Sequence, residues 1–220
     1  MPPDGQRRDG ARDSTPAMAD QQSKTINDKP KSRPGPLIIV SGPSGCGKST
    51  VIAKVRKTAR VPLRVSVSAT TRAPRAGEKD ATDYHFWTED FFKEQIRANS
   101  FLEWACVHGC YYGTLKSEVI PYREKGIGVI LDIDVQGATE IRRIFPDSVS
   151  VFMRTRSMET YEERLRSRGT ENEESLRRRL AAAQGELNHA GEYNVQVVNE
   201  DLDTAVKELR EFVESRFEGS

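Results

Sequence analysis

Short apolar runs alternate with helical patterns along most of the chain. The run Leu37–Val40 predicts a buried strand, and residues 49–60 after it have the spacing of a helix. Residues 63–67 alternate apolar and polar positions, and further short runs rich in β-branched side chains lie at 128–133, 149–153 and 195–198. Helical patterns separate the last three runs. Strands that alternate with helices predict an α/β fold with a parallel sheet covered by helices on both faces.

The segment 68–125 departs from that alternation. It combines the turn-rich stretch RAPRAGEKDATD, a helical pattern opened by Thr88, and the aromatic stretch EWACVHGCYYG. This mixture predicts a substrate region inserted into the α/β core. Near the end of the chain, residues 202–213 place their apolar side chains on one stripe, which predicts an amphipathic helix packed on the core.

An arginine-rich helical hairpin is predicted before that last helix. Arg164 and Arg168 are four residues apart and share a helix face. Gly169 can end the first helix, and Thr170 with Glu173 has the form of a capping box that starts the second. Considered alone, this hairpin is best interpreted as a solvated surface feature stabilised by salt bridges.

The N-terminal residues 1–34 contain five prolines among mostly charged and polar side chains and almost no large apolar side chain. Such a segment buries too little surface to offset the entropy lost on ordering, so we expect a disordered tail. Two alternatives remain open: a targeting peptide, against which the acidic residues of the tail count, and initiation at Met18.

Length and composition indicate a single globular domain with an insertion. The 220 residues are 36% hydrophobic and 30% charged, with 34 basic and 33 acidic side chains. A net charge of +1 provides no global field for nucleic acid or membrane partners, and no apolar stretch reaches the roughly 18 residues of a membrane span. Three unevenly spaced cysteines give no disulfide framework and only a weak zinc signal, which favours a reducing, cytoplasmic setting.

The stretch SGPSGCGKST, directly after the first predicted strand, matches the P-loop pattern G-x-x-x-x-G-K-[ST] at Gly42–Ser49. Glycines let backbone N–H groups surround phosphate oxygens at a helix N-terminus. Lys48 is then expected to reach the β and γ phosphates, and the Ser49 hydroxyl to ligate Mg²⁺. Asp132 and Asp134, at the end of a later buried strand, are candidates for the opposing carboxylate that such a site needs.

The inserted region supplies candidates for a second substrate. Arg72, Arg75, Tyr84 and Tyr112 offer two guanidinium groups and two phenol hydroxyls that can bind one phosphate monoester through charge-assisted hydrogen bonds. Isolated arginines and tyrosines are more often surface residues, so these side chains alone leave an ATPase, a GTPase and a small-molecule kinase all possible.

Six motifs in this order resemble those of guanylate kinase over residues 36–217: SGPSGCGKST, SVSATTRAPRAGEKDATDYHF, FLEWACVHGCYYGT, ILDIDVQG, RLRSRGTENEESLRRRLAAAQGEL and VVNEDLD. The resemblance implies the reaction ATP + GMP giving ADP + GDP, with MgATP as donor and dGMP as a further acceptor. It also implies a guanylate kinase-like domain at 35–217, in which a five-stranded parallel sheet flanked by helices carries a mixed α/β insertion. The implied parts are a core at 35–67, 126–155 and 190–217, a GMP-binding region at 68–125, and a helical lid at about 156–189.

The resemblance also implies roles for individual residues. On the acceptor side, the GMP phosphate is bound by Arg72, Arg75, Tyr84 and Tyr112, with Glu78 supporting the arginines, and guanine is bound by Ser68, Glu103, Thr114 and Asp134. An ionised Glu103 suits guanine because the base presents N1–H and N2–H₂ as adjacent donors, which adenine lacks. On the donor side, ATP is bound by Gly42, Pro43, Ser44, Gly45, Cys46, Gly47, Lys48, Ser49 and Thr50, with Asn199 beside the adenine.

The same resemblance changes the interpretation of the arginine hairpin. Arg164, Arg168 and Arg179 are implied to close over the triphosphate and, with Lys48, to neutralise charge during transfer. Ser49 and Asp132 are the implied metal residues. The main alternative is a guanylate-kinase-like module that binds protein without catalysis, although the chain keeps the P-loop and hairpin arginines that such modules typically lose. A P-loop kinase for another phosphate monoester is a third reading.

Cys46 is the least explained P-loop residue. Its position near a helix N-terminus and Lys48 can lower a thiol pKa and create an oxidation-sensitive spot. The simpler interpretation, a small side chain tolerated at a variable loop position, is favoured. The sequence does not determine the oligomeric state.

Overall fold

The computed structural model describes residues 33–107, 109–167 and 173–218. They all belong to one compact unit. The disorder expected for the N-terminal tail therefore stays a prediction. Arg168, Gly169 and Thr170 also lie outside the described residues.

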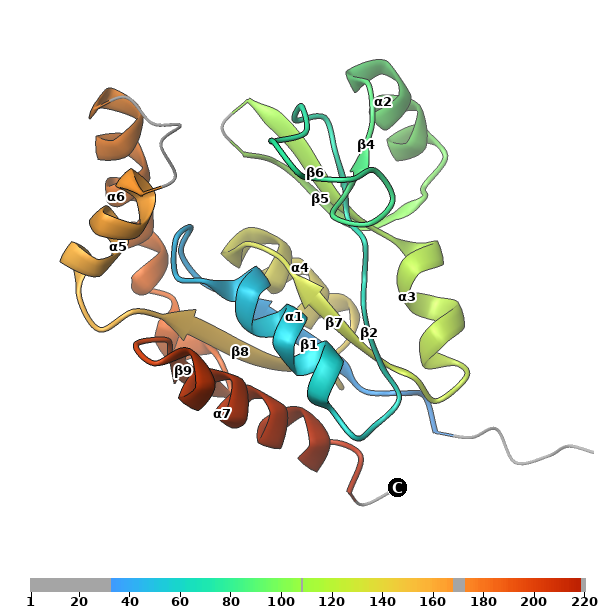
Figure 1. The fold of residues 1–220 in the computed structure, drawn as a ribbon. Coiled ribbons are helices and arrows are strands. Elements are labelled where there is room, and N and C mark those ends of the chain that lie inside the picture. The colour runs from blue at the N-terminus through green and yellow to red at the C-terminus, as the bar shows by residue number, and fades with distance from the viewer. Residues whose placement is uncertain (1–32, 108, 168–172, 219–220) are drawn as a thin grey trace, which may run out of the picture. The chain divides into compact units, whose positions relative to one another are not determined.

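The larger of two sheets contains five strands in the order β2-β7-β1-β8-β9 (Figure 1). Every neighbouring pair is parallel, which confirms the predicted sheet. Its strands are β1 (Leu37–Ser41), β2 (Leu63–Val65), β7 (Gly128–Asp132), β8 (Val149–Arg154) and β9 (Val195–Val198). β2 is shorter than the predicted strand: the Ser66 N–H still donates to the Ile130 carbonyl oxygen of β7, and the next N–H, that of Val67, donates to a Glu118 carboxylate oxygen.

Helices cover both faces of this sheet because each face is apolar. Along β1, Ile38 and Val40 enter one buried cluster, while Leu37 and Ile39 enter another on the opposite face. The first cluster packs against α1 (Lys48–Thr58) and the amphipathic α7 (Leu202–Ser215), as expected from the sequence. The second packs against α3 (Lys116–Arg123) and α4 (Val135–Ile144). A strand that is apolar on both sides is typical of a sheet buried between two helical layers.

The segment after β2 builds the smaller sheet, of four strands in the order β4-β3-β6-β5. Its strands are β3 (Ala69–Thr70), β4 (His85–Phe86), β5 (Phe101–Val107) and β6 (Cys110–Leu115), and α2 (Glu89–Arg97) packs on it. The predicted cap is confirmed, because the Thr88 side chain accepts a hydrogen bond from the Phe91 N–H. Phe92 and Phe101 stack with ring centroids 4.5 Å apart, so this region has an aromatic core of its own.

The smaller sheet joins the core at two connections that meet at Glu118 in α3. One Glu118 carboxylate oxygen accepts hydrogen bonds from the Arg64 guanidinium of β2 and from the Val67 N–H, the latter at 3.1 Å. The Arg64 guanidinium also lies over the Tyr122 ring, 3.6 Å from its centroid. The chain therefore leaves and re-enters the core beside the same carboxylate.

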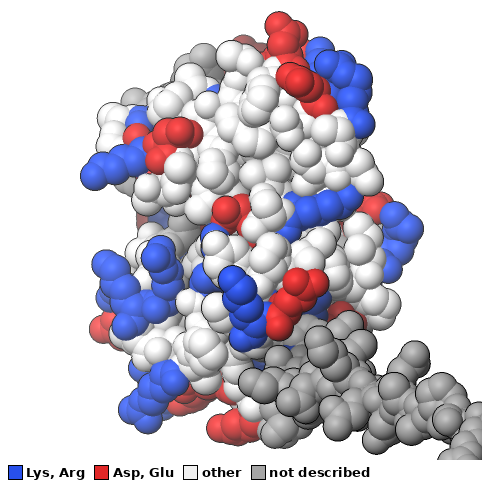
Figure 2. Space-filling model, turned by 90° about the vertical axis from the view of Figure 1, so that its right-hand side faces the viewer, with Lys and Arg blue, Asp and Glu red and all other residues white. Residues whose placement is uncertain are grey.

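Two further helices, α5 (Met158–Arg166) and α6 (Glu173–Leu187), pack on each other, and a short 3-10 helix, η1 (Ala190–Glu192), leads into β9. They lie near the loop between β1 and α1 in Figure 1. Among the described helices, none is both long and apolar enough to cross a membrane. On the face shown in Figure 2, acidic and basic side chains are interspersed among uncharged ones, in keeping with a net charge of +1.

Candidate active site

The P-loop connects β1 to α1 and requires glycine at its bends. Gly42, Gly45 and Gly47 have φ values of 139°, 95° and 91°, which side chains other than glycine rarely adopt. A Cβ atom on Gly42 would lie 2.0 Å from the Met153 carbonyl oxygen of β8. The loop therefore combines left-handed backbone with direct contact to a neighbouring strand, and Gly47 stands immediately before α1. Backbone N–H groups at such a helix start form an anion-binding site.

Lys48 begins α1, and its ammonium group donates a hydrogen bond to the Gly42 carbonyl oxygen at 2.6 Å. Burial of the ammonium group works to lower the pKa of Lys48. Attraction to nearby acidic groups, among them Asp132 and Glu186, outweighs burial and raises that pKa above its usual value. The side chain therefore keeps its positive charge inside the site.

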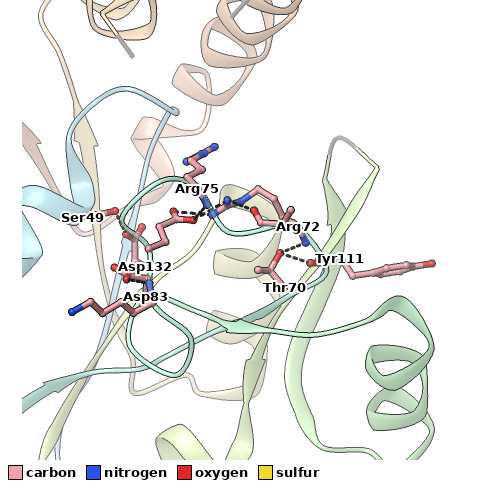
Figure 3. Close-up of polar contacts among 10 residues, drawn as sticks. Ser49, Thr70, Arg72, Arg75, Asp83, Tyr111 and Asp132 are labelled. Carbon is pink, nitrogen blue, oxygen red and sulfur yellow. Dashed lines mark hydrogen bonds and ion pairs between the residues drawn. The ribbon is translucent and has the colours of Figure 1, made fainter. Parts of the chain in front are cut away.

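Ser49 and Asp132 meet across the sheet edge, as Figure 3 shows. The Ser49 hydroxyl donates to Asp132 Oδ2 at 2.8 Å, which brings together the two residues predicted to hold the metal. Among the described residues, no group of three or more His, Cys, Asp or Glu side chains gathers as a metal site. Mg²⁺ usually takes one or two protein carboxylates and completes its shell with water and phosphate oxygens, so a hydroxyl and a carboxylate fit this ion.

The helices α5 and α6 and the loop after β9 contact the P-loop directly. The Arg179 guanidinium donates to Ser44 Oγ at 3.1 Å. The Arg164 guanidinium donates to the backbone carbonyl oxygens of Cys46 and Asn199, at 3.2 and 2.9 Å. The buried Asn199 amide also donates to the Cys46 carbonyl, at 2.7 Å. Arg164 and Asn199 thus bind the loop through the Cys46 carbonyl and do not line the cavity. Arg179, which binds Ser44, does line it.

The structure contradicts the lowered thiol pKa on which the oxidation-sensitive interpretation of Cys46 depends. Its side chain is fully buried in the apolar cluster between the sheet and α7. Burial raises the pKa of the Cys46 thiol, and the opposing influence of Lys48 does not reverse this shift. A small apolar side chain suits the position because it fills the space beneath the loop, which agrees with the simpler interpretation.

On the opposite side of the site, Glu78 holds the loop that carries both predicted phosphate-binding arginines. Its two carboxylate oxygens each accept a hydrogen bond from the Arg72 guanidinium at 2.9 Å, and Oε2 also accepts from the Arg75 N–H at 2.6 Å. Partial burial disfavours the charged form, but the hydrogen bonds from Arg72 and Arg75 prevail and lower the pKa of Glu78. The Glu78 carboxylate therefore stabilises this loop by binding the Arg72 side chain and the Arg75 backbone together.

Tyr84 and Tyr112 lie beside these arginines. Their ring centroids are 6.1 Å apart in an edge-to-face arrangement, and the Arg72 guanidinium carbon is 5.5 Å from the Tyr84 centroid. Burial raises the pKa of Tyr84 to about 12, so its hydroxyl remains a hydrogen-bond donor near neutral pH. Three of the four predicted phosphate contacts thus lie in the loop between β3 and β4, and the fourth, Tyr112, lies on β6.

Glu103 on β5 is a buried carboxylate in the same region, with an exposed fraction of 9%. The Thr114 hydroxyl of β6 donates to its Oε1 at 2.6 Å. Burial raises the pKa of Glu103 to about 7; the Thr114 hydrogen bond opposes this shift and the negative charge of Asp134 adds to it. Asp134 caps α4 by accepting a hydrogen bond from the Gly137 N–H at 2.8 Å. Three of the guanine residues implied by the resemblance, the buried Ser68, Glu103 and Asp134, therefore line one cavity, and Thr114 is bonded to Glu103.

One cavity of about 300 Å³ joins these groups. At one end, the P-loop end, it is lined by Gly42, Ser44, Gly45, Gly47, Lys48, Ser49, Thr50, Asp132 and Arg179. At the other, the acceptor end, it is lined by Ser68, Arg72, Arg75, Tyr84, Glu103, Tyr112 and Asp134. The remaining predicted residues with described side chains stand behind the lining rather than on it: Pro43, Cys46, Glu78, Thr114, Arg164 and Asn199.

Several lining residues were missed by the sequence reasoning. They are Ala105, Val107, Gly113, Ile133 and Glu186. The first four are small or apolar and carry no chemical signal. Glu186 stands seven residues after Arg179 on α6, so helix periodicity puts both on one face and could have revealed it. Burial raises the pKa of the Glu186 carboxyl, and Lys48 opposes that shift.

A parallel sheet whose first strand runs into a glycine-rich loop and a helix, with a cavity over the loop, defines a P-loop nucleotide-binding protein. A family model described as guanylate kinase matches residues 34–216. The chain therefore belongs to the guanylate kinase family, as the motifs indicated.

Individual relatives agree with this assignment. The chain is 45% identical over 179 residues to guanylate kinase of Caldanaerobacter subterraneus subsp. tengcongensis, covering 81% of this chain and 86% of that protein. It is 49% identical over 172 residues to guanylate kinase of Gloeobacter violaceus, covering 78% and 83%. A crystal structure of guanylate kinase from Anaplasma phagocytophilum matches with a TM-score of 0.70 and 29% identity, over 86% of this chain and 89% of that one.

Proposed function

We propose that this chain transfers the γ-phosphoryl group of ATP to GMP, giving ADP and GDP, and accepts dGMP as well. The observation that carries the proposal is the single cavity, lined at one end by the P-loop and at the other by two arginines, two tyrosines and a buried carboxylate. A cavity that serves only nucleotide hydrolysis has no need for a second anion-binding end.

At the P-loop end, ATP phosphates would take the position between the loop and Lys48. The ammonium group of Lys48, now bonded to the Gly42 carbonyl, would turn to the β and γ phosphates, and Arg179 would exchange Ser44 for a phosphate oxygen. We propose Mg²⁺, delivered as MgATP, as the ion held by Ser49 and Asp132. When bound, it would neutralise phosphate charge and orient the triphosphate.

At the acceptor end, Arg72, Arg75, Tyr84 and Tyr112 would bind the GMP phosphate. Glu78 supports this role because it already fixes Arg72 in a bidentate pair and so lowers the entropy lost on binding. Glu103 would accept N1–H and N2–H₂ of guanine, and Ser68, Thr114 and Asp134 would complete the contacts. A site built to pair these donors rejects adenine because its own buried polar groups would remain unpaired.

The chemistry is an in-line displacement. An oxygen of the GMP phosphate attacks the γ-phosphorus, the bond from that phosphorus to the β–γ bridging oxygen breaks, and ADP leaves with the bond's electrons. Lys48 and Arg179 supply positive charge where negative charge accumulates, so little covalent chemistry is asked of the protein. Arg164, from behind the loop, would hold the loop in place, and Arg168, outside the described residues, is proposed to close over the phosphates.

Closure of α5 and α6 over the cavity would also exclude water, which competes with GMP as acceptor. We place the reaction in the cytoplasm, because the three cysteines are free thiols, as is usual in a reducing compartment.

A coupled assay of ADP release with GMP, dGMP, AMP and UMP as acceptors tests the proposal. GMP and dGMP should be used far better than AMP and UMP. Equal use of GMP and AMP would contradict the guanine assignment. Binding of GMP without any ADP release would instead favour a non-catalytic interaction module.

A further inference from the structure

Gly137 lies in the first turn of α4, directly against the Glu103 carboxylate. A Cβ atom at this position would lie 2.8 Å from Glu103 Oε2 and 3.1 Å from its Cδ. Real Cβ atoms essentially never approach another heavy atom as closely as the first of these distances. Gly137 is buried within a regular helix, where glycine is costly relative to alanine, so its helical conformation gives no reason for glycine.

Glu103 is confined on the other side as well. Its Oε1 accepts the Thr114 hydroxyl at 2.6 Å, and the side chain is buried, so the carboxylate lies between β6 and the first turn of α4. These two neighbours belong to different parts of the fold: Thr114 lies on β6 of the smaller sheet, and Gly137 lies on α4, which packs on the larger sheet. The Glu103 carboxylate therefore occupies space that is open only because Gly137 has no side chain.

We propose that Gly137 is a positioning residue for base recognition, whose bare Cα lets the Glu103 carboxylate take the orientation that pairs with guanine. This inference rests on the proposed function. With alanine at this position, the atom that must move is the far end of the Glu103 side chain rather than the backbone. The fold then survives, while the two carboxylate oxygens turn away from the plane of the base.

Base recognition is sensitive to that turn because two adjacent donors of guanine need both partners aligned. IMP is a direct probe, because it keeps the N1–H donor and the phosphate of GMP but lacks the 2-amino group. A displaced carboxylate should therefore lower the affinity for GMP more than that for IMP, whereas a general structural defect would lower both alike.

The test compares Gly137→Ala with Gly185→Ala, which adds the same methyl group to a helix at a position with open space around it. Titration calorimetry would give the Kd for GMP, IMP and ADP, with ADP reporting on the P-loop end. For Gly137→Ala we expect the Kd for GMP to rise roughly ten- to a hundredfold, the loss of charge-assisted hydrogen bonds. The GMP preference over IMP should shrink, and the Kd for ADP should not change. Gly185→Ala should behave as the wild type.

The outcomes separate two failures. If the wild type itself does not prefer GMP to IMP and AMP, the proposed function fails and this inference with it. If the wild type prefers GMP and Gly137→Ala keeps that preference, only the role of Gly137 is overturned. Should Gly137→Ala prove unstable, the melting temperature of the double variant Gly137→Ala/Glu103→Ala is compared with that of Gly137→Ala alone. Recovered stability supports the contact with Glu103, and unrecovered stability shows a purely structural glycine.

Discussion

The P-loop end and the acceptor end of the cavity differ in where their polar groups come from. At the P-loop end, most lining residues are contiguous, Gly42–Thr50, and offer backbone held by positive φ angles. At the acceptor end, side chains come from β5, β6, the start of α4 and the loops beside β3. Two of them are held by another side chain, Arg72 by Glu78 and Glu103 by Thr114. The first end is suited to phosphates in general, whereas the second can be specific for one base.

This difference predicts that substitutions at one end leave the other intact. The largest effect is expected for Lys48→Met. Loss of the only lysine on the cavity lining among the described residues should lower kcat roughly a thousandfold, because charge developing on the phosphates is no longer neutralised. The Kd for GMP should stay unchanged. Lys54→Met on the same helix is the matched control, because its exposed ion pair with Asp203 contributes little. A parallel loss of GMP binding would contradict independent ends.

At the acceptor end, Glu78→Gln should raise the KM for GMP about tenfold and leave that for ATP unchanged. The variant removes the negative charge from the bidentate pair that orients Arg72, a charge-assisted contact stronger than a neutral one. Glu89→Gln is the control, since Glu89 forms an exposed pair with Lys93 on α2. Steady-state kinetics with each substrate varied in turn gives the answer, and an equal rise of both KM values would count against the separation.

A smaller effect is expected from pH. Because burial raises the pKa of Glu103 to about 7, the carboxyl is partly protonated near neutrality, and the proposed pairing with guanine requires the ionised form. GMP affinity should therefore fall as pH decreases through 7, by about fourfold between pH 8 and pH 6.5.

Titration of GMP at each pH measures this effect, and ADP serves as the P-loop probe. Glu103→Gln should bind GMP more weakly and lose the part of the pH dependence that Glu103 causes. Any pH dependence that remains in this variant then comes from ionisation of the GMP phosphate or of other groups. A wild-type affinity that does not change with pH would show that another group sets the protonation of the site.

The smallest effect is expected at Cys46. Its thiol is buried and its pKa raised, so an alkylating reagent should label the exposed Cys106 well before Cys46. Activity should persist while Cys106 is modified, and Cys46→Ala should remain active because Asn199 and Arg164 bond to its backbone carbonyl rather than its sulfur. Peptide mass mapping against residual activity measures both. Rapid labelling of Cys46 with loss of activity would mean that the loop opens readily.

The same contrast explains what the sequence could predict. Apolar runs and the P-loop motif are local patterns in the sequence, so they predicted the strands of the larger sheet and the P-loop around Lys48 directly. The acceptor residues are separated along the chain, and only the family resemblance connected Arg72 with Glu103. The very short β3 and β4 have no periodicity to recognise, and the burial of Cys46 belongs to a cluster drawn from elements far apart in the sequence.

Glu118 gives the attachment of the smaller sheet a mechanical meaning. Its carboxylate ties Arg64 and the Val67 backbone, on the outgoing connection, to the helix that forms the returning one. A second attachment lies where β5 contacts α4 at Glu103 and Gly137, so the smaller sheet is joined to the core at two separate places. Both attachments help to fix the spacing between the acceptor end and the P-loop end, and loss of the Glu118 carboxylate would remove the one at which the chain leaves the core.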